Sequence, residues 1–272
     1  MLKFNGWTKE EIAIKFVSKM NNKTYLFINN HIKKLKVEKN SRIVVHADLS
    51  RFGIVNRNLP SLVLKVLKNL VGKNGSIIMP AYNIGMPKDY IYNIKEFAKN
   101  LNISILSKEF FKTQKIYRSS NPIHNRIGVG KDSDFLLYSS ANSSYGKNSD
   151  FYHMYKKSFK LILLGCSPQQ GATYLHHLEA LVGVPYRKWI KIEKKILVKN
   201  KVKKIMVNYY TRKNLNYKAD FNFLFDKIKK SGAKINKINL KFGYSLSINL
   251  KDLHKYSELL LKKNSYAFVK KI

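Results

Sequence analysis

The chain has 272 residues, of which 44% are hydrophobic, and this is enough for one large domain. Its 52 Lys and Arg against 16 Asp and Glu give a formal charge of +36, which favours anionic partners: nucleic acid, an anionic membrane surface or phosphate-bearing small molecules. The single cysteine, Cys166, excludes an internal disulfide framework, and no stretch approaches the ~20 apolar residues of a membrane-spanning helix.

The first half of the chain alternates between helix-like and strand-like segments. Residues Met1–Lys9 lead into polar sequence without a secretory signal, so with one unpaired cysteine we expect a cytoplasmic protein. We predict a helix opening at the capping box Thr8–Glu11, a strand at Arg42–Val45 with a loop at His46–Gly53, a helix at Leu59–Val71, a strand at Gly75–Pro80, a short helix at Ser107–Lys112 and an irregular segment at Arg118–Gly130.

The second half continues the alternation. We predict a buried strand at Leu161–Leu164, a helix after Thr173, a β-hairpin over Ile190–Tyr210 that turns at Asn200-Lys201, an amphipathic helix at Ala219–Ser231, a strand at Phe242–Ile248 and a final helix at Leu250–Lys263. This order predicts one α/β domain over residues 1–272, in which the hairpin-plus-helix part, 190–272, forms a subdomain.

Polar side chains follow each presumed strand end. His46 and Asp48 follow the first strand, Tyr82 and Asn83 the second, and His176 and Glu179 lie beyond the third. The ligand crevice of an open α/β sheet lies outside the carboxyl ends of its strands. We therefore expect these three ends to converge if the strands are parallel neighbours.

The segment Thr173–Glu179 has the arrangement of a general base. With Thr173 as N-cap, His176 lies in the first helical turn, where the positive end of the helix dipole disfavours the imidazolium. Glu179, three residues on, can orient that ring. The alternative is a surface hydrogen bond between the two side chains. A zinc site is not expected, because the adjacent His176 and His177 lack i, i+4 spacing.

Several segments in register resemble the aminoglycoside 3-N-acetyltransferase family, also called the antibiotic N-acetyltransferase family. Its first loop is usually His-Ser-Ser followed by Gly, which His46–Gly53 resembles, and Gly75–Pro80 is similar to its Gly-Thr-Leu-x-Met-Pro strand. Further similar segments are Arg118–His124, Tyr145–Ser149, Leu163–Gly165, Thr173–Glu179 and Val184–Arg187.

This resemblance implies a single-domain α/β fold with a central mixed sheet flanked by helices, and transfer of an acetyl group from acetyl-CoA to an amine of an amino sugar. It implies that His176 is the catalytic base, a role that agrees with the position of Glu179. Thr173 is a candidate for stabilising the developing oxyanion. In the family, CoA contacts fall on the residues that match His46, Ala47, Asp48, Arg118 and Ser119. The alternative for Arg118 is a structural ion pair.

The chain also departs from the family. Ala47 and Asp48 replace the two serines of the first loop, Asn121-Pro122 replaces His-Pro, and Ser149-Asp150 replaces Ser-Pro. Drug-modifying members carry acidic residues after the hairpin, whereas residues 208–213 contain none. A +36 protein repels a polycation at long range. We therefore favour a nucleotide-linked or surface-glycan amino sugar over an aminoglycoside as the acceptor, while an aminoglycoside acetyltransferase proper stays an alternative.

Three other interpretations stay open. Cys166 is a candidate nucleophile for a covalent acetyl-enzyme, although a cysteine after an apolar strand usually packs as a small hydrophobe. A basic nucleic-acid-binding protein fits the charge and the 17 tyrosines, but these are dispersed and no recognised module is present, so specific binding is not expected. A catalytically dead scaffold is the third. Weak association with an anionic surface is compatible with the charge, and the oligomeric state is not indicated.

Overall fold

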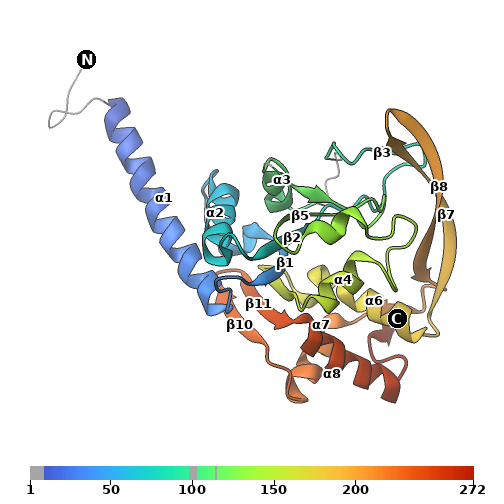
Figure 1. The fold of residues 1–272 in the computed structure, drawn as a ribbon. Helices are drawn as coiled ribbons and strands as arrows, with labels where there is room; N and C mark the ends of the chain where they lie inside the picture. Colours follow the sequence, from blue (N-terminus) through green and yellow to red (C-terminus); the bar gives the residue numbers. More distant parts are fainter. Residues whose placement is uncertain (1–8, 98–102, 114) are drawn as a thin grey trace.

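A seven-stranded mixed sheet lies at the centre of the fold (Figure 1). The computed structural model describes residues 9–97, 103–113 and 115–272. The strand order is β10-β11-β6-β1-β2-β5-β4. The strands are β1 (Arg42–Ala47), β2 (Ser76–Pro80), β4 (Tyr117–Arg118), β5 (Arg126–Gly130), β6 (Lys160–Leu164), β10 (Asn236–Leu240) and β11 (Gly243–Asn249).

The three strands at the middle of the sheet are parallel. β1 pairs with β2 on one side and with β6 on the other, and the flanking pairs are antiparallel. The carboxyl ends of β6, β1 and β2 therefore meet at one edge of the sheet, as the sequence predicted.

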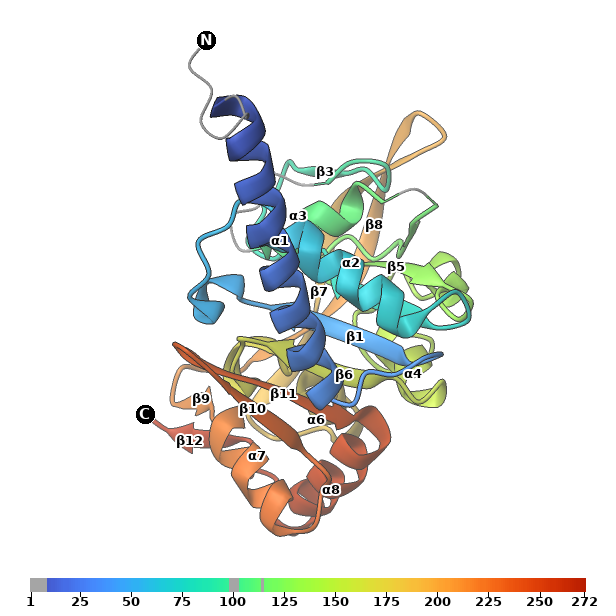
Figure 2. The same ribbon diagram turned by 90° about the vertical axis from the view of Figure 1, so that its left-hand side faces the viewer.

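Helices cover both faces of the sheet (Figure 2). On one face lie α1 (Lys9–Lys34), α2 (Leu59–Val71) and α3 (Ile105–Phe111), and on the other lie α4 (Asp150–Lys156), α5 (Pro168–Gly171), α6 (Tyr174–Val182), α7 (Phe221–Lys230) and α8 (Leu250–Lys263). Successive side chains of β1 point to opposite faces of the sheet, so this strand contributes to the hydrophobic core on each face. Ile43 and Val45 pack on the face covered by α1 and α2, and Val44 packs on the other face. The α/β class with a mixed central sheet is confirmed.

A long hairpin forms a wall on the side of the molecule opposite to α1 (Figure 1). It consists of β7 (Arg187–Val198) and β8 (Lys201–Arg212), and β3 (Ile91–Tyr92) pairs with β7. The two-residue turn is Lys199-Asn200, one residue earlier than predicted, and both residues have positive φ. Near the C-terminus, β9 (Tyr217–Ala219) pairs with β12 (Val269–Lys271).

The predicted helices at Leu59–Val71 and Leu250–Lys263 are confirmed. The expectation of irregular structure over Arg118–Gly130 holds for residues 119–125 and is wrong at both ends, because Tyr117–Arg118 and Arg126–Gly130 are strands. Two glycines and a fully buried arginine hide the alternation in the second of these. Thr8 of the predicted capping box lies outside the described residues, but a helix is present from Lys9.

The C-terminal part does not separate from the rest as a unit over 190–272. β11 pairs with β6, so β10 and β11 complete the central sheet, and α8 packs against α6 and α4 in the core of that face. The hairpin stands at the edge of the main body, and the N-terminal part of α1 projects from the opposite side (Figure 1). None of the helices in the described ranges combines the length and the apolar character needed to cross a membrane.

Gly165 controls how the end of β6 approaches the end of β1. Its φ is +73°, and a Cβ there would lie 2.3 Å from the carbonyl oxygen of Asp48. Gly183 has nearly the same φ, +74°, but faces open space. Gly183→Ala should cost about 1–2 kcal/mol for the left-handed backbone alone. Gly165→Ala should cost about 2 kcal/mol more, because the backbone must also shift. Urea unfolding measures both losses, and equal losses would contradict this packing account.

Candidate active site

A cavity of about 610 Å³ opens at the carboxyl edge of the parallel strands. We call it the edge pocket. It is lined by residues at the end of β1 (His46, Ala47) and just after it (Asp48), and by residues that follow β2 (Tyr82) and β6 (Cys166, Gln170, Thr173). The three strand ends thus meet around one cavity, but Asn83, His176 and Glu179, which the sequence analysis grouped with them, are not part of its lining.

His176 lies in the first turn of α6, as predicted, and the carboxylate of Glu179 holds its ring at one nitrogen. Its Nδ1 lies 2.6 Å from Oε2 of Glu179. Nη2 of Arg187, which can only donate, lies 3.0 Å from the same nitrogen, so Nδ1 has two competing partners. The carboxylate is the nearer one and favours a proton on Nδ1, which leaves Nε2 as the ring nitrogen with a lone pair available to accept a proton. The His176 side chain is 24% exposed and lines a second cavity of about 520 Å³ next to the hairpin.

Glu179 is fully buried, so the pair is not a surface hydrogen bond. Tyr186 donates its hydroxyl to Oε1 at 2.9 Å, and Nε of Arg187 lies 2.7 Å from Oε2. Burial alone would raise the pKa of Glu179, but His176, Arg187 and the Tyr186 hydrogen bond together hold this pKa below its usual value. Glu179 is therefore a fixed anion that orients the His176 ring and can stabilise an imidazolium.

Thr173 precedes α6 as predicted, but its side chain does not cap the helix. Its backbone is already helical, and its hydroxyl lies 2.9 Å from the hydroxyl of Tyr82 instead. Nη2 of Arg126 donates to the same phenol oxygen at 2.7 Å. A Tyr82 proton directed at Thr173 leaves the Thr173 hydroxyl proton for a group in the edge pocket.

A buried ion pair holds Arg126 in place, and Arg126 in turn holds the hydrogen-bonded hydroxyls of Tyr82 and Thr173. Nη1 of Arg126 lies 3.2 Å from Oδ2 of Asp150, and both side chains are almost fully buried. The guanidinium also lies 3.7 Å from the centre of the Phe151 ring. Sequence reasoning missed this pair, since Arg126 lies in the segment expected to be irregular. The unusual Asp150 after Ser149 was the one available signal.

Three further histidines near the site are buried and neutral. The ring nitrogens of His124 face the hydroxyls of Ser144 and Tyr145, and Nδ1 of His177 accepts from the Gly146 N–H at 3.1 Å. Burial, aided by nearby positive charge, lowers the pKa of His46, His124 and His177 to about 3 each. His177 faces the core and takes no part in the exposed site of His176.

Arg118 and Ser119 are not among the residues that line the edge pocket. Arg118 is 3% exposed, and its donors go to Asn125 and to the backbone carbonyls of residues 93, 94 and 96. Ser119 is fully buried and accepts the Arg126 N–H. Arg118 is not a surface cation, and it forms no ion pair with the described residues; instead, it ties the chain around β3 to β4. This geometry speaks against the expected CoA contacts of both residues.

Cys166 lines the edge pocket but is only 7% exposed. Burial raises the pKa of its thiol to about 12, so the thiolate that a nucleophile needs is not populated near neutral pH. No three His, Cys, Asp or Glu side chains in the described part of the chain gather as a metal site requires.

The chain is similar to known proteins over most of its length. Residues 44–262 match the family model of the aminoglycoside 3-N-acetyltransferases. Aminoglycoside N(3)-acetyltransferase III of Acinetobacter baumannii is 24% identical over 190 residues, which are 64% of this chain and 66% of that protein, slightly under two thirds of it. The prophage-derived aminoglycoside N(3')-acetyltransferase-like protein YokD of Bacillus subtilis is 25% identical over 195 residues, 64% of this chain and 70% of that protein.

Solved structures share the fold. A binary complex of AAC-IIIb with CoASH superposes with a TM-score of 0.75 at 18% identity, covering 88% of this chain and 96% of that chain. The structure of Bacillus subtilis YokD gives a TM-score of 0.71 at 19% identity, covering 88% and 93%.

The neutral histidines predict a loss of stability in mild acid. Unfolded histidines bind protons below about pH 6.5, whereas His46, His124 and His177 do so in the folded protein only near pH 3. Stability therefore falls as the pH drops from about 6.5 towards 3, by about 1.4 kcal/mol per pH unit for each histidine. His177→Asn keeps an acceptor for the Gly146 N–H. Between pH 6 and 4.5 it should reduce the pH dependence of the free energy of unfolding by about 1.4 kcal/mol per pH unit, the share of one histidine. An unchanged slope in urea-unfolding data would contradict the assignment.

Proposed function

The chain belongs to the aminoglycoside 3-N-acetyltransferase family, and we propose that it transfers the acetyl group of acetyl-CoA to an amine of an amino sugar that carries an anionic group. Acetyl-CoA is the co-substrate of this family. The observation that carries the proposal is His176, partly exposed beside a cavity and held at Nδ1 by the buried anion Glu179. A cytoplasmic location is part of the proposal, supported by the single unpaired cysteine.

His176 acts in this proposal as general base and then general acid. Its Nε2 takes a proton from the acceptor amine as the N–C bond forms, because an ammonium cannot attack a thioester. The imidazolium, stabilised by Glu179, returns that proton to the departing CoA sulfur as the C–S bond breaks. The Thr173 hydroxyl donates to the carbonyl oxygen while negative charge develops there.

The edge pocket is the proposed site for acetyl-CoA. His46, Ala47 and Asp48 line it, as the family resemblance implies, and Thr173 brings the oxyanion donor to the same cavity. The Asp48 carboxylate accepts from Ser50 and pairs with Arg51 at 3.3 Å, so its charge is compensated at a site meant for phosphates.

The acceptor is proposed to be a nucleotide-linked or surface-glycan amino sugar. The relatives are named for aminoglycosides, which are polycations, and solved neighbours include AAC-VIa bound to sisomicin. Here the formal charge is +36, and the end of the hairpin over residues 208–213 contains no acid. Such a field attracts a phosphate-bearing amino sugar and repels a polycation.

Variants at the dyad test the proposed chemistry. His176→Asn should lower kcat by at least about 100-fold, since general-base catalysis contributes on that order, while acetyl-CoA binding is retained. Cys166→Ala is the matched control and should keep full turnover, because its thiol stays protonated. The release of free CoA measures turnover, and calorimetry measures binding. Full activity of His176→Asn, or a dead Cys166→Ala that still folds, would overturn the proposed role of the base.

The choice of acceptor has a separate test. With acetyl-CoA saturating, we expect CoA release with nucleotide-linked amino sugars and little with kanamycin-type drugs. Rapid acetylation of kanamycin with no turnover of nucleotide amino sugars would reverse the assignment and make the chain an aminoglycoside acetyltransferase proper.

A further inference from the structure

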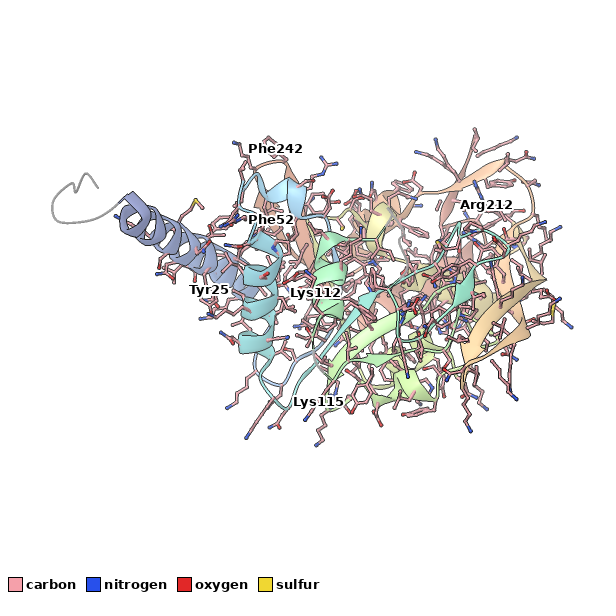
Figure 3. The ribbon with its side chains drawn as sticks, turned by 90° about the horizontal axis from the view of Figure 1, so that it is seen from above. Tyr25, Phe52, Lys112, Lys115, Arg212 and Phe242 are labelled. Atoms are coloured by element: carbon pink, nitrogen blue, oxygen red, sulfur yellow. The ribbon has the colours of Figure 1, made fainter. Side chains whose placement is uncertain are left out.

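The second cavity, which we call the basic pocket, has an unusual concentration of cations. Its volume is about 520 Å³, and its lining includes His176, Arg187, Arg212, Lys218, Asp220 and Lys270. Arg187 and Arg212 come from the base of the hairpin, whereas Lys218 and Lys270 come from β9 and β12. Arg212 lies on the hairpin side of the molecule, away from α1 (Figure 3).

These four cations form two like-charge pairs across antiparallel strands. Arg187 is directly opposite Arg212 in the β7–β8 register, and Lys218 is directly opposite Lys270 in the β9–β12 register. Like charges directly opposite each other destabilise a sheet. Negative charge in or near this cavity would therefore offset the repulsion within the two pairs.

The protein supplies only half of that negative charge. Arg187 pairs with Glu179 at 2.7 Å, and Lys270 pairs with Asp220 at 3.2 Å. Within the described residues, neither Arg212 nor Lys218 has a carboxylate partner. The guanidinium of Arg212 donates only a long bond, 3.5 Å, to the carbonyl oxygen of Tyr217. Each like-charge pair thus keeps one positive charge that no carboxylate compensates.

The start of α7 adds to the same field. This helix has ten residues, its N-cap is Asp220, and Ala219, Asp220 and Asn222 all line the basic pocket. The N–H groups of Phe221 and Phe223 at this end are already bonded to Gln169 and Asp220, so the helix contributes through its dipole. The N-terminal end of a helix carries partial positive charge, which favours anions. Helix end, arginine and lysine therefore meet at one cavity from three elements of the chain.

We propose that the basic pocket is a subsite for a phosphate or diphosphate group, held by Arg212 and Lys218 beside His176. Two uncompensated charges match a dianion, and an arginine can bind phosphate oxygens bidentately. This deepens the proposed function and rests on it: the anion belongs to the amino sugar, and its capture brings the amine towards His176. A second source has the same chemistry, namely the diphosphate of CoA.

Calorimetric titration of inorganic pyrophosphate into the full chain at 0.15 M NaCl tests the site without relying on turnover. Arg212→Gln and Lys218→Gln should each weaken binding about 10-fold, since each removes a charge-assisted contact. Arg57→Gln and Lys229→Gln remove the same charge from exposed positions elsewhere and should change it less than about twofold. Equal effects in all four variants, or no pyrophosphate binding by the parent chain, would overturn the subsite.

A repeat titration with saturating acetyl-CoA separates the two sources. If pyrophosphate still binds, the pocket is free for the anionic group of the acceptor, as proposed. If binding is lost, the pocket holds the diphosphate of CoA, and the assignment to the acceptor is overturned. With a nucleotide-linked amino sugar as acceptor, Arg212→Gln should raise its KM about 10-fold and leave the KM for acetyl-CoA unchanged. If the parent chain binds pyrophosphate at this pocket but transfers no acetyl group, the proposed function fails and the subsite stands.

Discussion

The buried carboxylate of Glu179 is the group on which the site depends. It fixes the ring of His176 from within α6, accepts from Tyr186 and pairs with Arg187 at the start of the hairpin. An unpaired carboxylate would be costly at this depth, so the helix end and the hairpin must stay together for the charge to be satisfied. The same contacts that hold the hairpin in place therefore also position the ring of His176.

Charge is arranged differently in the two cavities on either side of the start of α6. In the edge pocket, Asp48 is compensated by Arg51 and by Ser50, and the nearby histidines are neutral. In the basic pocket, by contrast, two cations have no carboxylate partner. A neutral pocket suits a thioester arm, whereas a cationic one suits the anionic part of an acceptor. The chain thus combines the fold of aminoglycoside acetyltransferases with a formal charge of +36.

Local patterns were sufficient for much of the fold and for the dyad. The apolar runs of β1, β2 and β6 and the helical periodicity of α2 and α8 are read directly from the sequence, and His176 and Glu179 are three residues apart on one helix. Contacts between distant residues were not readable: Arg126 meets Asp150 through the tertiary fold, and Lys218 meets Lys270 through two three-residue strands too short to give a pattern. Arg118 was misjudged for the same reason, since its partners become visible only once the loop before it is folded.

The tautomer of His176 tests the central claim most directly. In ¹⁵N-histidine-labelled protein, at a pH where the ring is neutral and with the resonance assigned by comparison with His176→Asn, we expect a protonated Nδ1 and a bare Nε2, because Nδ1 lies nearer to Glu179, at 2.6 Å, than to Arg187, at 3.0 Å. That result leaves Nε2 ready to accept a proton from the substrate amine. A bare Nδ1 with the proton on Nε2 would contradict the account, since Glu179 would then not hold the ring and the base would have no lone pair for the substrate.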